Sequence, residues 1–592
     1  MADKIISGAE YLIREVDKDE VFTPEDFTEE QRQIADTTSQ IAMNDILPRI
    51  REIDEQNFDL VLEFMRKCGE LGLLMTDVPE AYGGLGLDKV TTMLVADRMA
   101  PCGSFSVSFS AHTGIGMLPI VYYGTPEQKE KYLEKLMSAE WISAYCLTEP
   151  ESGSDAMGVR ATAKLSDDGK HYILNGTKQF ITNAGFANLF VVFVRIDGEH
   201  FSTFLVERDY EGVTIGPEEK KLGIKGSSTC PVILEDVKVP VENLLGEIGK
   251  GYKIALNILN FGRFKLGAAV TGAARHVLNV GVKYSNERYQ FGVPISTFGA
   301  IQEKIANMIA EVFASESLIY RSAGHLDAKI ATLDKDAEDY YDQYQKVIEN
   351  FSVECAIAKV YCSEVLSDVA DEVLQIHGGY GFTQEYDAER YYRDERINRI
   401  FEGTNEINRM LIPGTILKKG LKGELPIQKE AMKAFEALMT PSLEEIDEEE
   451  LFAKEKLALK NLKQIFLILS GAAAQKYMEK LKDEQEILMA AADIAMEIYA
   501  IESALLRAEK IFDRVDDAKK ELLKAVVLVY TFNGVETAAS AAKRGAFYVE
   551  EGDTLKMILS GIRRYTKFDA EGLLKAKRLL AAAAIKAEKY IF

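Results

Sequence analysis

The spacing of apolar residues changes twice along this chain of 592 residues. It is helical from about Phe27 to Trp141, short and β-like from Val159 to Pro240, and helical again from about Gly251. The stretch beyond Gly420 is rich in Ala, Glu, Lys and Leu and is helical throughout. Because the chain is too long for one hydrophobic core, this order predicts an α+β multidomain protein.

We expect four domains in this order. An N-terminal helical domain covers residues 1–144, and a central β-barrel-like domain covers residues 145–250. A helical-bundle domain of the four-helix type covers residues 251–418, and an additional C-terminal helical domain covers residues 419–592. Pro413-Gly414 and the glycine-containing stretch 418–426 predict a linker between the last two domains.

Local signals predict several element boundaries. Thr28 and Gln31 have the spacing of a capping box at a helix start. Asp168-Gly169 lies between two β-like stretches and is typical of a hairpin turn. The unbroken apolar run 189–194 indicates a strand buried on both faces, and His377-Gly378-Gly379 indicates the end of a long helix.

The composition is that of a globular protein, with 47 % hydrophobic and 28 % charged residues. The formal net charge of −24 argues against binding to nucleic acid or to an anionic membrane surface, because both would be repelled. No run approaches the ~18 uncharged apolar residues of a membrane helix. The N-terminus lacks the apolar segment of a signal peptide, and the six scattered cysteines favour reduced thiols. We therefore expect a cytoplasmic protein.

Single motifs do not identify a function. The glycine-rich stretches 83–86 and 378–381 lack the strand-to-helix context of a dinucleotide fingerprint, and the first is better explained as a tight turn. No P-loop, HExxH or GxSxG motif occurs, and the six histidines are dispersed. His112 and His377 are expected to be packed or capping residues. The sequence predicts no metal site.

Four segments are informative together. Residues 145–155 (YCLTEPESGSD) form a hydroxyl- and glycine-rich loop that can offer donors to a phosphate or a ring edge. Residues 179–183 (QFITN) place an aromatic ring and a hydroxyl on one strand face. Residues 288–292 (RYQFG) and 399–409 (RIFEGTNEINR) complete the set. Each segment alone is more simply explained as a helix end or a loop.

In this order and at these spacings, the four segments resemble the acyl-CoA dehydrogenase family over residues 27–418. The stretch 260–263 (NFGR), the RYQFG segment and the C-terminal extension look most like the very-long-chain branch. The resemblance implies FAD-dependent α,β-desaturation of fatty acyl-CoA thioesters, the first oxidative step of fatty acid β-oxidation. We expect long-chain substrates, although the sequence does not give the chain length.

The resemblance implies a cofactor site and a homodimer. Thr182 would donate a hydrogen bond to flavin N5, and Phe180 stands where the family usually has tryptophan. Several residues would contact the FAD of a second subunit: Arg288, Gln290, Phe291, Gln375, Gly378 and Gly379. The other implied FAD-binding residues are Tyr145, Leu147, Thr148, Gly153, Ser154, Ile181, Thr404, Asn405 and Glu406.

Glu402 matches the family's catalytic base, which removes the α-proton while flavin N5 takes the β-hydride. Some members carry the base immediately before the arginine that matches Arg263, but here that position is Gly262. Desaturation needs a base because the α C–H bond of a thioester is unreactive. A buried carboxylate suits this role, because burial raises its pKa and makes it a stronger base than in water. The implied substrate-binding residues are Ser154, Asn260, Phe261, Gly262, Arg263, Phe401 and Gly403.

Two questions stay open at the level of sequence. The acceptor implied by the resemblance is an electron-transfer flavoprotein, while an acyl-CoA oxidase would use oxygen and a non-catalytic acyl-CoA-binding or assembly protein would use neither. The extension could pack where shorter relatives place a second dimer, or it could touch a membrane surface, as in relatives of the very-long-chain branch. We favour the dehydrogenase, because the match to the very-long-chain pattern counts against an oxidase and the intact Glu402 and flavin motifs count against a non-catalytic protein. We favour the packing role, because the acidic balance of the chain opposes membrane contact.

Overall fold

The computed structural model describes residues 6–439, 447 and 449–592. Its N-terminal part is helical, as the periodicity predicts, and α1 begins with the expected capping box between Thr28 and Gln31. The helices of this part are α1 (Glu29–Gln40), α2 (Ile50–Asp54), α3 (Phe58–Glu70), α4 (Lys89–Met99), α5 (Ser104–Ala111), α6 (Leu118–Tyr123) and α7 (Pro126–Met137).

The middle part is one eight-stranded sheet in the order β6-β7-β3-β2-β4-β5-β8, with β1 paired to β4. The predicted hairpin joins β2 to β3 in antiparallel register, and the apolar run forms the buried strand β4. The strands are β1 (Ser143–Cys146), β2 (Thr162–Leu165), β3 (His171–Thr182), β4 (Leu189–Ile196), β5 (His200–Glu207), β6 (Val213–Ile215), β7 (Thr229–Pro240) and β8 (Leu244–Leu245).

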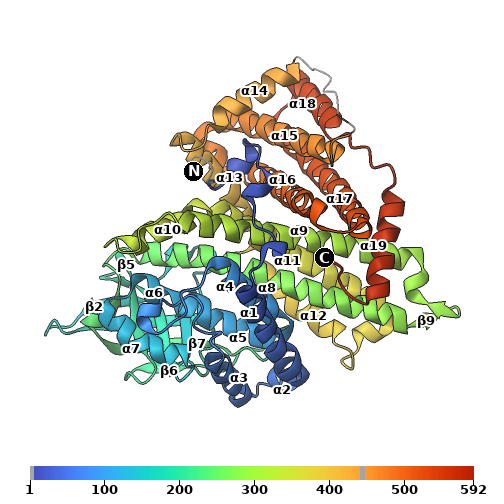
Figure 1. Cartoon of the computed structure of the whole chain (residues 1–592). Coiled ribbons are helices and arrows are strands. Elements are labelled where there is room, and N and C mark those ends of the chain that lie inside the picture. Colours follow the sequence, from blue (N-terminus) through green and yellow to red (C-terminus); the bar gives the residue numbers. More distant parts are fainter. Residues whose placement is uncertain (1–5, 440–446, 448) are drawn as a thin grey trace.

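Long helices follow the sheet and cross the middle of the molecule (Figure 1). A short hairpin of β9 (Tyr289–Gln290) and β10 (Val293–Pro294) projects between the first two. The predicted stop at His377 is confirmed, because α11 ends there and Gly378 takes a φ of 59°. The helices are α8 (Gly251–Glu287), α9 (Gly299–Ile330), α10 (Tyr340–Asn350), α11 (Ser352–His377), α12 (Ala388–Glu395) and α13 (Asn405–Leu421).

The predicted linker is wrong over its first half. Pro413 and Gly414 lie inside α13, which continues to Leu421. Proline removes one helical hydrogen bond, but Pro413 is buried, and the packing of α13 against α11 and α16 outweighs that loss. Only residues 422–426 connect α13 to the next helix.

The C-terminal extension is helical and forms the upper part of the molecule in Figure 1. Its last helix, α19, returns to pack against α9 and α17. The helices are α14 (Ile427–Met439), α15 (Ala453–Tyr477), α16 (Gln485–Ile511), α17 (Asp517–Val549), α18 (Gly552–Tyr565) and α19 (Leu573–Ala587).

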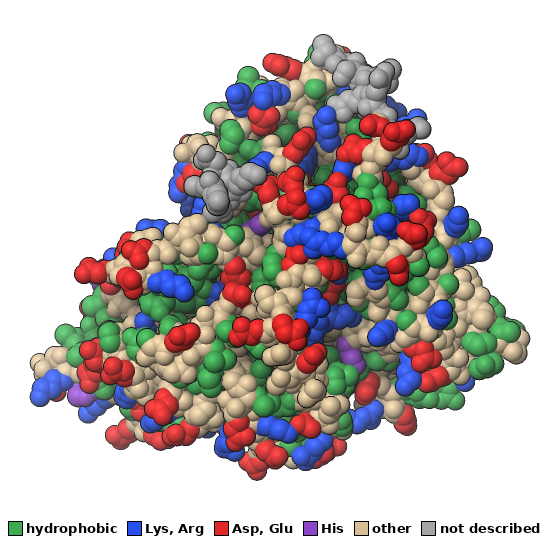
Figure 2. All heavy atoms as spheres, viewed as in Figure 1, with side chains coloured by type: hydrophobic (Ala, Val, Ile, Leu, Met, Phe, Trp, Pro, Cys, Tyr) green, Lys and Arg blue, Asp and Glu red, His purple; other side chains and the backbone are tan. Residues whose placement is uncertain are grey.

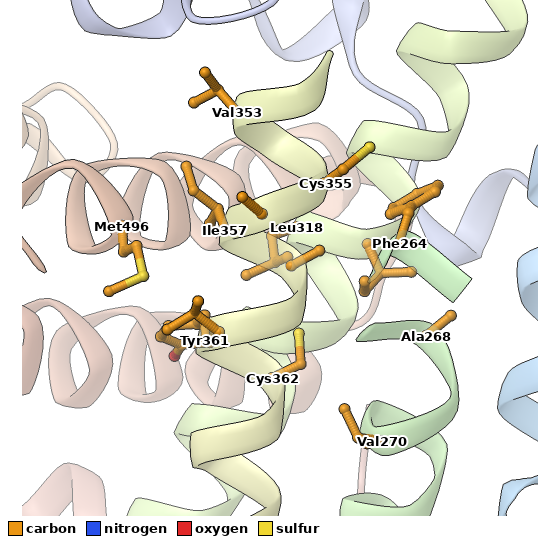
Figure 3. Close-up of a cluster of buried hydrophobic side chains, with 14 of the residues drawn as sticks. Phe264, Ala268, Val270, Leu318, Val353, Cys355, Ile357, Tyr361, Cys362 and Met496 are labelled. Carbon is orange, nitrogen blue, oxygen red and sulfur yellow. The ribbon is translucent and has the colours of Figure 1, made fainter. Parts of the chain in front are cut away.

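The extension shares an apolar core with the central helices. Figure 3 shows Met496 of α16 beside Ile357 and Tyr361 of α11, with Leu318 of α9 and Phe264 of α8 further along the same cluster. The same interface buries ion pairs, among them Arg321 with Glu502 at 2.7 Å and Arg507 with Glu316 at 2.8 Å. Breaking such pairs is costly because it leaves a charge in the core, so the extension is fixed to the central helices.

Two helical segments, Ala453–Asp483 and Asp517–Val549, are long and apolar enough to cross a membrane by length and composition. In the most apolar window of each segment, 50 % and 61 % of the residues are buried inside the structure. Buried core helices also meet these criteria of length and composition. Acidic and basic side chains are interspersed over the visible face of the molecule (Figure 2).

Candidate active site

A cavity of about 460 Å³ lies between the sheet and the central helices. The loop after β1 and the end of β3 form one side, and α5, α8, α12 and the start of α13 form the others. The volume is in the range of small-molecule and cofactor sites. Thirteen of the residues expected at the site line this cavity: Tyr145, Leu147, Thr148, Gly153, Ser154, Phe180, Ile181, Thr182, Gly262, Arg263, Phe401, Glu402 and Gly403.

Glu402 lies in the short loop before α13, and its backbone is strained. Its φ is +56°, a left-handed value that is unusual for a residue with a side chain, and Gly403 follows with a φ of +80°. Thr404 then caps α13 by accepting a hydrogen bond from the Ile407 N–H at 3.3 Å. The loop therefore turns the Glu402 side chain into the cavity wall while the helix begins behind it.

The Glu402 carboxylate is poised to accept a proton. Burial raises its pKa to about 7, against the opposing effects of the positive charges of Arg263 and Lys359. Its Oε2 atom is enclosed and has no hydrogen-bond partner among the residues that the structure describes. A carboxylate with a raised pKa is a stronger base than one in water, because burial takes away part of the solvation that stabilises its charge.

Gly262 gives the carboxylate its space. A Cβ atom at this position would lie 2.9 Å from Glu402 Oε2 and 3.2 Å from Glu402 Cδ. Real Cβ atoms do not approach an oxygen this closely, so any side chain at 262 would displace the carboxylate. The sequence identified Gly262 as a position that cannot supply a base, and the structure adds that it makes room for one.

The sheet side of the cavity fits a flat, polar-edged ring such as a flavin. The side chains of Thr148, Ser154 and Thr182 line it, and their hydroxyl groups have no hydrogen-bond partner among the described residues. Phe180 has a φ of +58° within a register shift of β3 and is 62 % exposed, so its ring stands at the cavity edge. Apolar faces and free hydroxyls together suit an isoalloxazine ring.

Other expected residues lie just behind the cavity wall. Asn260 and Phe261 are buried in α8, and Asn260 accepts a hydrogen bond from Arg263 at 3.0 Å. Asn405 is also buried, and its amide is bonded to Lys359, Ser363 and Glu364. Thr404 and the exposed Glu406 lie at the start of α13. These five residues support the loop or the helix without lining the cavity.

The residues expected to reach a second subunit form a separate group on the surface. Arg288, Gln290 and Phe291 belong to the β9–β10 hairpin, and Phe291 is 93 % exposed. Gln375, Gly378 and Gly379 lie at the end of α11 and are exposed as well. The two segments are adjacent, because the Arg288 guanidinium lies 5.1 Å from the centre of the Tyr380 ring.

The structure adds residues that the sequence did not single out. Lys359 is fully buried beside the Glu402 loop, and Lys265 lines the cavity and donates to Thr113 Oγ1 at 2.7 Å. Lys359 is a single charge within an apolar helical stretch, which was the available signal, whereas Lys265 stands only two residues after Arg263. His276 and Tyr391 line the cavity away from Glu402, and their helical positions gave no such signal.

No group of residues that could hold a metal ion occurs among the described residues. All six cysteines are free and buried, as expected. His112 is packed in the core with hydrogen bonds to Ser143 and Leu136, and burial lowers its pKa to about 4. His377 bonds to the Val373 carbonyl at the helix end. The ionisable chemistry of the site is therefore centred on Glu402.

Comparison with protein families matches all four parts of the chain. The acyl-CoA dehydrogenase N-terminal domain matches residues 28–140, the middle domain 144–237 and the C-terminal domain 249–417. A further acyl-CoA dehydrogenase C-terminal domain matches residues 461–564 in the extension. Fold and site thus define an oxidoreductase of the acyl-CoA dehydrogenase class. The chain belongs to the acyl-CoA dehydrogenase family.

Individual relatives agree with this assignment. A probable acyl-CoA dehydrogenase of Bacillus subtilis is 48 % identical and matches 100 % of this chain and 99 % of that protein. The human very long-chain specific acyl-CoA dehydrogenase is 36 % identical over 79 % of this chain and 72 % of that protein. The crystal structure of an acyl-CoA dehydrogenase complexed with FAD from Bacillus anthracis superposes with a TM-score of 0.97 at 47 % identity, covering 99 % of this chain and 100 % of that chain.

Proposed function

We propose that Glu402 is the base that removes the α-proton of a bound acyl thioester in this FAD-dependent acyl-CoA dehydrogenase. One observation carries the proposal: Glu402 lines the cavity, and its enclosed Oε2 atom has no hydrogen-bond partner among the described residues. Burial also raises the pKa of this carboxylate to about 7. A pKa near the working pH gives a useful fraction of the ionised form together with a strong tendency to bind a proton.

The charge that develops on the thioester oxygen also needs a donor. The backbone N–H of Glu402 donates no hydrogen bond to any residue that the structure describes. It stands beside the carboxylate that removes the proton, so one residue can supply both the base and a donor for the enolate-like oxygen. Such preorganised donors are a large part of the rate enhancement in reactions of this type.

The cofactor is FAD, and the sheet side of the cavity fits it. Thr148, Ser154 and Thr182 would bond its polar edge, and Tyr145 and Phe180 would pack against its ring. When bound, FAD supplies the two-electron acceptor for the hydrogen that leaves the β carbon. The exposed hairpin residues and the end of α11 would contact the FAD of a second subunit, which supports a homodimer.

The cavity favours a long acyl chain. Beyond Gly262, which lies against the proposed base, residues of α8 line it as far as Val277, a stretch of helix that rises about 22 Å. The cavity is also lined by small residues on or beside α5, including Gly103, Ser106 and Gly114, which leave space for an acyl chain next to α8. A short acyl chain would leave much of this part of the cavity without apolar contact. We therefore assign the enzyme to long-chain acyl-CoA.

Electrons leave the enzyme to an electron-transfer flavoprotein in this proposal. The cavity edge at Phe180 is exposed, so a protein acceptor can approach the site closely. The protein would act in the cytoplasm, and its extension would pack on the central helices rather than bind a membrane surface. The buried apolar and ionic contacts of α16 support that role.

Glu402→Gln tests the assignment of the base. The variant keeps the shape of the side chain but removes the proton acceptor, so it should bind FAD and acyl-CoA and lose desaturation by several orders of magnitude. Turnover within tenfold of the wild-type rate would remove Glu402 from the mechanism. An absorbance spectrum of the purified variant checks that the flavin is retained.

A further inference from the structure

The loop that carries Glu402 is held by buried side chains from three helices. Arg263 of α8 donates to the Glu402 carbonyl at 3.1 Å. Asn408 of α13 donates to the Gly403 carbonyl at 2.8 Å and to the Thr404 carbonyl at 3.1 Å. A left-handed conformation at a residue with a side chain persists only where its surroundings enforce it. These hydrogen bonds hold Glu402 in its left-handed conformation.

Lys359 of α11 is the third of these side chains, and it is fully buried. Its ammonium donates to the Gly403 carbonyl at 2.8 Å and to Asn405 Oδ1 at 2.6 Å. The Asn405 amide is in turn fixed by Ser363 and Glu364. An ammonium is costly to bury, so a neutral side chain would be expected here if the position only filled space.

The charge on Lys359 acts on the proposed base. The charged groups that act on Lys359 are Glu402 and Arg263 across the loop, Glu364 on its own helix and Glu406 on α13. Burial lowers the pKa of Lys359, the negative charge of Glu402 opposes that shift, and Lys359 in turn lowers the pKa of Glu402. Together with Arg263, it opposes the effect of burial on the carboxylate.

We propose that Lys359 is a positioning residue for the reaction, which holds the Glu402 loop in its left-handed conformation and places a positive charge beside the base. The inference rests on the proposed role of Glu402. It gives Lys359 two effects that a purely structural lysine would lack. One is on the rate, because the loop orients the carboxylate. The other is on the pH at which the base ionises.

The chain offers a matched control in Lys419. This lysine is also buried, and its ammonium holds two backbone carbonyls, those of Gly8 at 2.8 Å and Asn350 at 2.7 Å. Neither carbonyl belongs to the cavity. Lys359→Met and Lys419→Met therefore each remove one buried ammonium and the bonds to its carbonyls, and only the first change touches the Glu402 loop.

The test compares both variants with the wild-type holoenzyme, using palmitoyl-CoA as substrate over a range of pH. For Lys359→Met we expect kcat at pH 7 to fall about tenfold or more with KM changed less, because a positioning contact acts on the transition state. The midpoint of the kcat/KM profile should move up by about one pH unit, because a nearby cation is lost. Lys419→Met should lower only the melting temperature.

An unchanged midpoint in Lys359→Met, with a rate per folded enzyme equal to that of Lys419→Met, would overturn the inference. Where Lys359→Met gives no folded protein, Lys359→Gln takes its place with the same expected shift. Glu402→Gln is measured in parallel. If that variant keeps its turnover, the proposed base is wrong. If it is inactive and the Lys359 variant behaves like the control, only the inference on Lys359 fails.

Discussion

Gly262→Ala should slow the reaction. The added Cβ would lie 2.9 Å from Glu402 Oε2, where ordinary contacts begin at 3.4 Å, so the carboxylate must retreat by about 0.5 Å. A displacement of about 1 Å at a reacting centre can cost about a hundredfold, so half of that predicts a fall in kcat of about tenfold. Alanine is about 1 kcal/mol better than glycine inside a helix, and this should offset part of the steric cost.

Gly414→Ala is the control for this prediction. Gly414 lies exposed in α13, and a Cβ there would meet nothing within 4 Å. It should raise the melting temperature through the same helix propensity and leave kcat unchanged. Stopped-flow and steady-state measurements of the reaction rate of both variants test this prediction. A Gly262→Ala enzyme with wild-type kcat would refute the close packing of the carboxylate against α8.

Three further predictions follow from the site and the core. The kcat/KM of the wild-type enzyme should fall about tenfold per pH unit below a midpoint near 7, because protonation of Glu402 removes the base, and a profile flat from pH 5 to 8 would contradict this. Thr182→Val should weaken FAD retention by about tenfold, the loss of one hydrogen bond, measured by the flavin content after dialysis. Arg507→Met should lower the free energy of unfolding by about 3 kcal/mol, because it removes the ion pairs with Glu25 and with the buried Glu316, which keeps only Arg275, and a urea titration measures it.

The sequence predicted most of the architecture because it depends on local signals. Apolar spacing separated the helical parts from the sheet, and the turn residues Asp168 and Gly169 and the helix stop at Gly378 were in agreement with the structure. The linker at Pro413 was wrong because proline is a local signal, whereas α13 is held by tertiary contacts with α11 and α16. Packing across the chain outweighed the local preference there.

The site was predicted in outline only. Matching motifs gave Glu402 and the hydroxyl residues that line the cavity, because these positions carry recognisable chemistry. The motifs gave neither the strain at Glu402 nor the space left by Gly262, since both arise from the approach of α8 to the loop before α13. Lys359 was missed for the same reason. Its partners, the Gly403 carbonyl and Asn405, are more than 40 residues away in sequence.

Hydrogen exchange at the α carbon tests the central claim most directly. The wild-type holoenzyme and Glu402→Gln are each incubated without oxygen in D₂O with palmitoyl-CoA, and the recovered thioester is analysed by mass spectrometry. We predict deuterium at the α carbon with the wild-type enzyme and none above background with Glu402→Gln, because the amide of the variant cannot accept the α-proton and pass it to solvent. Exchange by the variant at the wild-type rate would contradict the assignment of Glu402 as the base.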